Sequence, residues 1–491
     1  VGGARLAELR KLDLAARFRE RHGLSAEECP PARILTLEEA VELVRCQEKT
    51  RIHFELKDRI GAEAAGIVKD LGASRWCGFN CDHLAWLEEA ASVDPSVALF
   101  WDRQTEGSAE LLRDIAAGFN AQYDGLPVKI ERAGGYADIF RKVSASIRAR
   151  RLPSLAVAYE SMTAEYIPTG AVTPLDPLIA DPEVGLSKED SADFFPAVIE
   201  TNTFEDFGGR MYSFPFAKSV LMLYFNKRVL AAAGIEAPPQ TWEEFLAQCR
   251  QIKTETGKPA HAISVDCSTV DGMIFSMGGD VLRDGKLQFD SPEAIRVFEL
   301  YQTLIEEDLA YQITPGTFED NLALADDRVA FVLRTSSTRA PMAQLMDYDY
   351  DRWGRVAIPQ ADPAHPATVL FGPNVCIFNT TPEQQRAGWQ FVKFFTSTEN
   401  SVRWALGTGY LPIRKSAAQH PDMQAFWDEW RYNRTAFDCL AYARAEPNVA
   451  GWQEVRDLVE RALTEVLTKT KSGRQAALDL QRAADAALQR H

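Results

Sequence analysis

The chain has 491 residues, of which 46% are hydrophobic, 25% charged and 10% aromatic. This composition can bury large cores and excludes a disordered chain, and a length of about three average domains of ~150 residues predicts two or three domains. A formal net charge of −16 repels phosphate polymers, so we expect no nucleic-acid partner.

Strands and helices alternate through the first hundred residues. Thr36 is expected to begin a helix, because Glu39 follows it at the spacing of a capping box. Residues 51–57 alternate apolar and polar side chains, as a half-buried strand does, and a second short strand is expected at 76–79, after a helix at 61–71. This series predicts parallel strands.

The eight cysteines are spread thinly, and no pairing follows from their spacing. Cys77, Cys81 and His83 lie close together in the sequence, but C-x3-C-x-H without a second group of ligands matches zinc spacing poorly. We therefore interpret these thiols as buried structural side chains and predict no metal centre.

A second pattern of strands and helices begins at Ser96. Its first part predicts strands at residues 97–101, 128–130 and 153–158, the last of them a short apolar run that suits a buried parallel strand. Amphipathic spacing predicts a helix at residues 108–123. Later strands are expected at 222–226, 329–333 and 375–378, and long helices at 291–308 and 382–396. The whole series predicts an α/β protein.

Three phrases near the start, at residues 6–13, 34–43 and 53–57, resemble the middle of a glycerophosphodiester phosphodiesterase barrel. In that family the glutamate matching Glu55 binds a divalent metal at the end of a barrel strand. The family's other metal ligands and both of its acid–base histidines have no counterpart in this sequence. The resemblance therefore implies an incomplete (β/α) barrel remnant over residues 1–95, without phosphodiesterase activity and without a bound metal.

Four later phrases resemble the extracellular solute-binding proteins of ABC importers, in the group that includes sugar- and glycerol-3-phosphate-binding members. They are residues 166–176, 212–227, 239–245 and 408–413. The resemblance runs from Val97 to Leu488 and implies a two-lobed, periplasmic-binding-protein-like fold of type II. We expect residues 96–214 plus 331–370 to form the first lobe, and 215–330 plus 371–491 to form the second with its C-terminal helices.

A binding function follows from the same resemblance. The chain is expected to enclose a small polyhydroxylated solute between the lobes by hinge closure, and to deliver it to the membrane permease of an ABC importer. We therefore expect no enzyme activity and no cofactor. The expected location is the periplasm or the cell exterior, with or without a membrane tether, after removal of a targeting segment that the given sequence does not contain.

The candidate ligand-binding residues follow from their positions in the resemblance. They are Trp101, Glu106, Tyr136, Ser219, Ser264, Gly372, Tyr410 and Arg444. Tyr410 is expected to stack on the solute, and Arg444 to bind a phosphate through its guanidinium. Structural roles remain open for several of them: Trp101 as an anchor of the lobe core, Ser219 as a plain hinge residue, Gly372 as a residue that serves only the backbone geometry, and Arg444 as a solvated surface residue.

The ligand itself stays open at this point. The paired tryptophans that glycerophosphate-binding members carry after the position of Ser264 are absent, and Asp266 and Asp271 stand nearby. Carboxylates suit sugar hydroxyls and repel phosphate, which favours a neutral saccharide. The adjoining phosphodiesterase-like segment favours glycerol-3-phosphate or a glycerophosphodiester instead.

Two alternatives concern residues 1–95. The chain could be a split or degenerate phosphodiesterase that needs a partner chain, in which case turnover with a divalent metal would distinguish it from a receptor. The segment could also mediate self-association through unpaired sheet edges.

Overall fold

A computed structural model describes residues 37, 39, 40, 52–55, 68, 77–80, 96–104 and 106–490; the side chains of residues 52–55, 77–80 and 106 are not described. The chain divides into two compact units, Val1–Val97 with Ala145–Arg151 and Ala98–Ser144 with Leu152–His491.

In the N-terminal unit, two described strands bear out the predicted alternation. β1 (Ile52–Glu55) and β2 (Cys77–Asn80) pair in parallel, with Ile52 opposite Cys77. Leu37, Glu39 and Ala40 are helical, as expected after Thr36, and Val68 lies in the predicted second helix. Cys81, His83 and the rest of that predicted helix lie outside the described residues.

The first sheet of the larger unit contains five strands among the residues that the structure describes, in the order β4-β3-β5-β17-β8. β3 (Ala98–Asp102) pairs in parallel with β4 (Val128–Arg132) and β5 (Leu155–Ala158), while β17 (Asn374–Ile377) runs antiparallel to β5 and to β8 (Phe214–Pro215). All four residues of β5 are buried, because helices cover both faces of this part of the sheet. We call this sheet and its helices the first lobe.

Three long helices cover the first lobe. α6 (Glu106–Gln122) follows β3, and α18 (Pro382–Phe395) and α19 (Thr398–Thr408) pack against it from a distant part of the sequence. Phe391 of α18 joins Phe100 and Phe119, with ring centroids 6.0 and 5.6 Å away. α7 (Tyr136–Ala149) follows β4.

The second sheet holds seven strands within the described ranges, and we call it with its helices the second lobe. Its centre is β9 (Ser219–Asn226), buried throughout, which pairs antiparallel with β14 (Phe331–Thr335), β15 (Trp353–Ala357) and β16 (Thr368–Phe371). The outer strands are β10 (His261–Ile263), β13 (Ala310–Gln312) and β18 (Ala443–Ala445).

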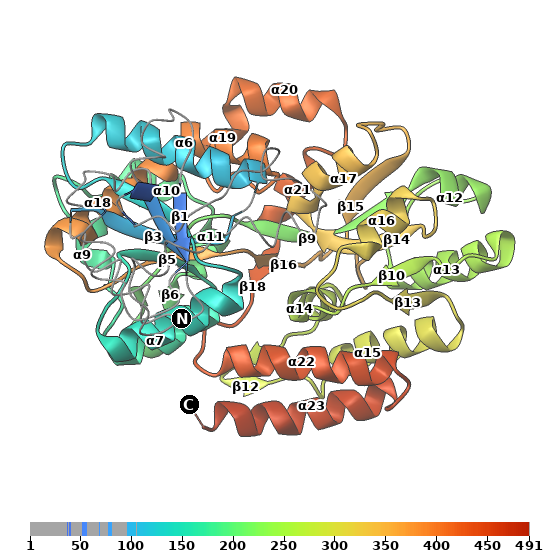
Figure 1. Cartoon of the computed structure of the whole chain (residues 1–491). Coiled ribbons are helices and arrows are strands. Elements are labelled where there is room, and N and C mark those ends of the chain that lie inside the picture. Colours follow the sequence, from blue (N-terminus) through green and yellow to red (C-terminus); the bar gives the residue numbers. More distant parts are fainter. Residues whose placement is uncertain are drawn as a thin grey trace, which may run out of the picture. The chain divides into compact units, whose positions relative to one another are not determined.

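Helices of the second lobe gather on one side of its sheet. α15 (Pro292–Glu306), α22 (Trp452–Leu467) and α23 (Gly473–Leu488) pack side by side, and α14 (Cys267–Ser276) lies between them and β16 (Figure 1). α13 (Trp242–Thr256) begins within residues 239–245, one of the phrases that carry the resemblance, and Thr241 and Glu244 form a complete capping box at its start.

The two sheets divide the chain differently from the predicted boundaries. Residues 331–370, expected in the first lobe, supply β14, β15 and β16 to the second sheet, whereas β17, expected in the second lobe, joins the first. The chain changes sheets at Gly372. Its φ is +115°, and a Cβ at this position would lie only 2.1 Å from the carbonyl oxygen of Ala217, so there is no room for a side chain. Both flanking strands are short and apolar, so their pattern does not tell which sheet each one joins.

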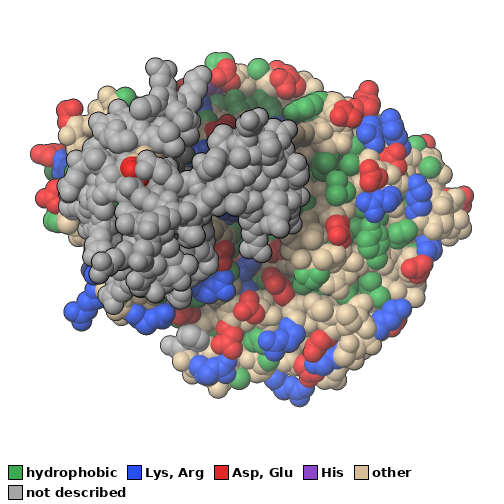
Figure 2. All heavy atoms as spheres, in the orientation of Figure 1, with side chains coloured by type: hydrophobic (Ala, Val, Ile, Leu, Met, Phe, Trp, Pro, Cys, Tyr) green, Lys and Arg blue, Asp and Glu red, His purple; other side chains and the backbone are tan. Residues whose placement is uncertain are grey.

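Over the described residues, no helix is long and apolar enough to cross a membrane. On the face drawn in Figure 2, basic and acidic side chains are interspersed over the described surface, and the described part of that face shows no extended basic patch of the kind that nucleic acids bind.

Candidate ligand-binding cleft

A cavity of about 490 Å³ lies between the two lobes, at the edge where the parallel strands of the first sheet end. This volume is typical of a site for a small organic ligand. The first lobe contributes Arg103, Gln104, Ser108, Tyr136 and Tyr159; the crossing segments contribute Ser219, Phe371, Gly372, Thr408 and Tyr410; the second lobe contributes Ser264, Asp266, Ser268, Thr269, Phe318, Arg334, Thr335, Ser337 and Thr338, among others.

Tyrosine rings form one wall of the cavity. The rings of Tyr136 and Tyr159 lie 4.4 Å apart between centroids, and the guanidinium carbon of Arg103 lies 4.8 Å from the Tyr136 centroid. Tyr410 stacks on Trp404 at 6.2 Å with nearly parallel planes. Aromatic faces of this kind bind the apolar faces of sugars and polyols, while the serine and threonine hydroxyls around them hydrogen-bond to hydroxyl groups.

Arg103 is the cationic group at the cavity that has no carboxylate partner among the described residues, since Arg334 is held by Asp320. Arg334 donates from Nη2 to Oδ1 of Asp320 at 2.6 Å, and that carboxylate is fully buried. Burial alone would lower the pKa of Arg103, but the neighbouring hydroxyls of Tyr136 and Tyr410 raise it, so the guanidinium stays charged. With no carboxylate of the described residues on it, this guanidinium is available to an anionic group of a solute.

Asp102 lies directly behind Arg103, at the end of β3. Burial raises the pKa of this carboxyl to about 6, although its Oδ2 accepts a 2.6 Å hydrogen bond from the backbone N–H of Gln104. The side-chain amide of Gln104 is buried at the cavity wall, and its Nε2 has no acceptor among the residues whose side chains the structure describes. That N–H is thus an available donor for a solute oxygen.

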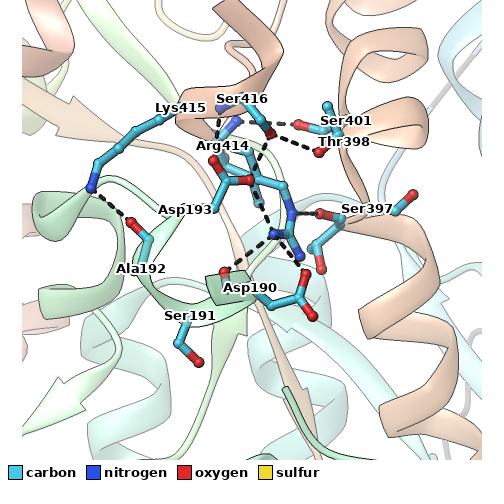
Figure 3. A network of polar contacts seen from close by, with 12 residues as sticks. Asp190, Ser191, Ala192, Asp193, Ser397, Thr398, Ser401, Arg414, Lys415 and Ser416 are labelled. Carbon is cyan, nitrogen blue, oxygen red and sulfur yellow. Dashed lines mark hydrogen bonds and ion pairs between the residues drawn. The ribbon is translucent and has the colours of Figure 1, made fainter. Parts of the chain in front are cut away.

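The segment that carries Tyr410 is fixed at two points. The N–H of Leu411 donates to the carbonyl oxygen of Lys218 at 2.8 Å. Further along, Arg414 is buried and donates to Asp193 at 3.2 Å, and the N–H of Ser416 donates to the same carboxylate at 2.7 Å (Figure 3). Tyr410 therefore projects from a rigid segment, which suits a residue that must meet a ligand in one geometry.

A buried ion pair lies where the crossing segments meet. The ammonium of Lys218 is 2.9 Å from Oε1 of Glu160 and also donates to the carbonyl oxygen of Gly372 at 3.0 Å. Asn374 donates to the same carboxylate oxygen at 3.0 Å. We call Lys218, Glu160, Gly372 and Asn374 the hinge cluster, because it joins the first lobe to two of the segments that cross between the sheets.

The structure places Tyr136, Ser219, Ser264, Gly372 and Tyr410 at the cavity wall; their contact with a ligand stays a prediction. Glu106 begins α6, and its side chain is not described. Trp101 lies elsewhere. It is 4% exposed within β3, where it pairs with Glu131 and Ala156, as expected for a lobe-core anchor.

Arg444 and Asp271 also lie away from the cavity. Arg444 donates to Oδ2 of Asp280 at 2.7 Å and to the carbonyl oxygen of Gly279 at 3.0 Å, so its guanidinium is already occupied. Asp271 is fully buried in α14, beside Cys267 and Glu446, whereas Asp266 lines the cavity at the helix start.

The sequence reasoning missed Arg103, Gln104 and Tyr159. Each follows the carboxyl end of a parallel strand, β3 or β5, where ligands of α/β sheets bind. Applying that rule to the residues after each predicted strand would have selected them. Trp101, by contrast, is the last residue but one of β3, and its side chain is buried in the lobe.

Replacing Tyr410 by alanine is expected to weaken solute binding by about 1–3 kcal/mol, because it removes an aromatic face at the cavity while leaving its fixed backbone in place. Titration calorimetry measures the change. Since Tyr410 also stacks on Trp404, a melting curve should accompany it; an unchanged dissociation constant in a folded variant would remove Tyr410 from the site.

Two α/β lobes, joined by crossing segments and separated by a solute-sized cavity, define the class of bilobed solute-binding proteins. The family model of the bacterial extracellular solute-binding proteins matches residues 114–429, and the chain belongs to this family.

Individual relatives agree with this assignment. The sn-glycerol-3-phosphate-binding periplasmic protein UgpB of Escherichia coli is 23% identical over 399 residues, which cover 77% of this chain and 89% of the relative. The crystal structure of UgpB from Mycobacterium tuberculosis with glycerophosphocholine superposes with a TM-score of 0.71 at 22% identity, over 80% of this chain and 98% of that one. A cyclic α-maltosyl-1,6-maltose binding protein from Arthrobacter globiformis gives a TM-score of 0.68 at 20% identity, over 80% and 99%.

Proposed function

We propose that this solute-binding protein is the receptor of an ABC importer for a small polyhydroxylated solute that carries a phosphate ester, of the glycerol-3-phosphate or glycerophosphodiester kind. The observation that carries the proposal is the cavity of about 490 Å³ between the lobes, where Arg103 has no carboxylate partner among the described residues. The guanidinium would bind the phosphate, and the surrounding hydroxyls would bind the glycerol.

The charges at the cavity support a diester in particular. Asp266 lines the cavity together with Arg103, so both signs of charge are present. A solute with a phosphate and a cationic head group would meet both, and the tyrosine rings could receive that head group as a cation–π partner. The named ligands of the relatives in Escherichia coli and Mycobacterium tuberculosis belong to the same chemical class.

The partner and location follow from this role. A receptor of this family lies outside the cytoplasm and delivers its solute to a membrane permease, so we propose the periplasm or the cell exterior as its location. We also propose that the solute is bound and released without chemical change. For residues 1–95, we propose a phosphodiesterase-like barrel remnant that serves as a structural appendage.

Calorimetry tests the proposal with sn-glycerol-3-phosphate, glycerophosphocholine and maltotriose. We expect saturable binding of at least one phosphate ester, and weaker or no binding of the neutral sugar. Binding of maltotriose alone would overturn the phosphate-ester assignment while keeping the receptor class. In a parallel assay with a divalent metal, release of glycerol-3-phosphate from glycerophosphocholine would support the split phosphodiesterase instead.

A further inference from the structure

A second, small cavity lies on the far side of Tyr410 from the solute site. Its volume is about 20 Å³, and its walls include Arg339, Arg355 and the aromatic side chains of Phe426 and Trp427. A cavity needs roughly 10–15 Å³ by this measure to hold one water molecule. This one therefore admits a single particle of about that size.

Two guanidinium groups line this cavity, and both are buried. Arg355 is 3% exposed and donates to three backbone carbonyl oxygens, those of Ser336 at 2.7 Å, Asn433 at 3.2 Å and Tyr432 at 3.3 Å, and the Tyr224 hydroxyl accepts from it as well. Arg339 is 8% exposed, and its guanidinium carbon lies 4.5 Å from the Phe426 ring centroid. Its Nε is buried, and no acceptor for it lies within the described ranges of the chain.

Neither guanidinium has an ion-pair partner in the part of the chain that the structure describes. Their partners are neutral groups: backbone carbonyls, an aromatic face, and the hydroxyls of Tyr350 and Tyr224. Burial, followed by the positive charge of Arg355, lowers the pKa of Arg339. Arginine nevertheless stays protonated in proteins, so two like charges lie in one buried pocket, an arrangement that a negative charge would stabilise.

We propose that the cavity walled by Arg339 and Arg355 is a binding site for a small monovalent anion, chloride being the one that fits. The unpaired Nε–H of Arg339 donates to the anion, while Arg355 keeps its carbonyl partners and acts through its charge. Phosphate, sulfate and carboxylates are too large for a space that holds one water-sized particle. Because Tyr410 lines both cavities, the anion would support the segment that presents this ring to the solute.

Bromide substitution tests the site directly. Crystals of the full chain grown in sodium bromide should show an anomalous peak in this cavity, between Arg339 and Arg355. A cavity that holds only water, with no anomalous signal, would overturn the proposal whatever the variants do.

A melting experiment gives a second readout in solution. The melting temperature should be about 2–4 °C higher in chloride, at roughly a hundred times its dissociation constant, than in gluconate at equal ionic strength. Arg339→Met should abolish this difference. Arg482→Met on α23 removes the same charge from a side chain that is 73% exposed, and should preserve it. Equal melting temperatures of the wild-type protein in both salts would contradict the site.

Discussion

Replacing Lys218 by methionine is expected to lower the free energy of unfolding by about 3–5 kcal/mol. The Lys218 side chain is 0% exposed and that of Glu160 is 4% exposed, so removing the ammonium leaves a carboxylate buried without its counter-ion. Lys218 and Asn374 both donate to this carboxylate, and only the side-chain amide of Asn374 would remain. Urea denaturation followed by tryptophan fluorescence measures the loss.

Two controls separate charge from packing in the hinge cluster. In the double variant Lys218→Met, Glu160→Leu, both charges are gone, and much of the lost stability should return because apolar side chains replace a buried pair at little cost. At the surface, Arg141→Met breaks an ion pair whose arginine is 74% exposed and should cost below about 1 kcal/mol. If the double variant lost as much free energy of unfolding as the two single variants lose together, the two charges would not stabilise each other.

Replacing Arg103 by methionine should weaken binding of a phosphate-ester solute by about 2–4 kcal/mol, or roughly 30- to 1000-fold. The variant removes the guanidinium that no carboxylate of the described part of the chain holds, so a neutral sugar should lose much less affinity. Calorimetry with glycerophosphocholine measures the change.

Arg444→Met is the matched control for this experiment, because it removes an arginine that is held by Asp280 outside the cavity. Its affinity for the phosphate ester should match that of the wild-type protein. If Arg444→Met lost the phosphate ester selectively and Arg103→Met did not, the phosphate position would be the one first suggested by the sequence resemblance.

The individual elements of the fold could be predicted because their signals are local. The capping boxes at Thr241 and Thr381 mark helix starts that depend on a few neighbouring side chains, and the apolar run at 222–226 falls within β9. The sheet to which a strand belongs is a different matter. The chain changes sheets at Gly372, where a side chain would meet the carbonyl oxygen of Ala217, a residue 155 positions away in the sequence, so the local pattern does not show the change.

The site could be predicted only where position in the chain places a residue at the cleft. Tyr136 and Tyr410 belong to segments that the resemblance identifies, and both line the cavity. Whether a charged side chain can bind a solute depends on whether an oppositely charged side chain lies beside it in the folded chain. The sequence does not show that Asp280 occupies Arg444, that Asp320 occupies Arg334, or that Arg103 has no such partner among the described residues.

The most direct test of the receptor assignment is small-angle X-ray scattering of the full chain, with and without a saturating phosphate-ester solute. We expect the radius of gyration to fall as the lobes close, and the solute to be recovered unchanged afterwards. Identical scattering curves for glycerophosphocholine, sn-glycerol-3-phosphate and maltotriose, together with no thermal shift for any of them, would contradict it.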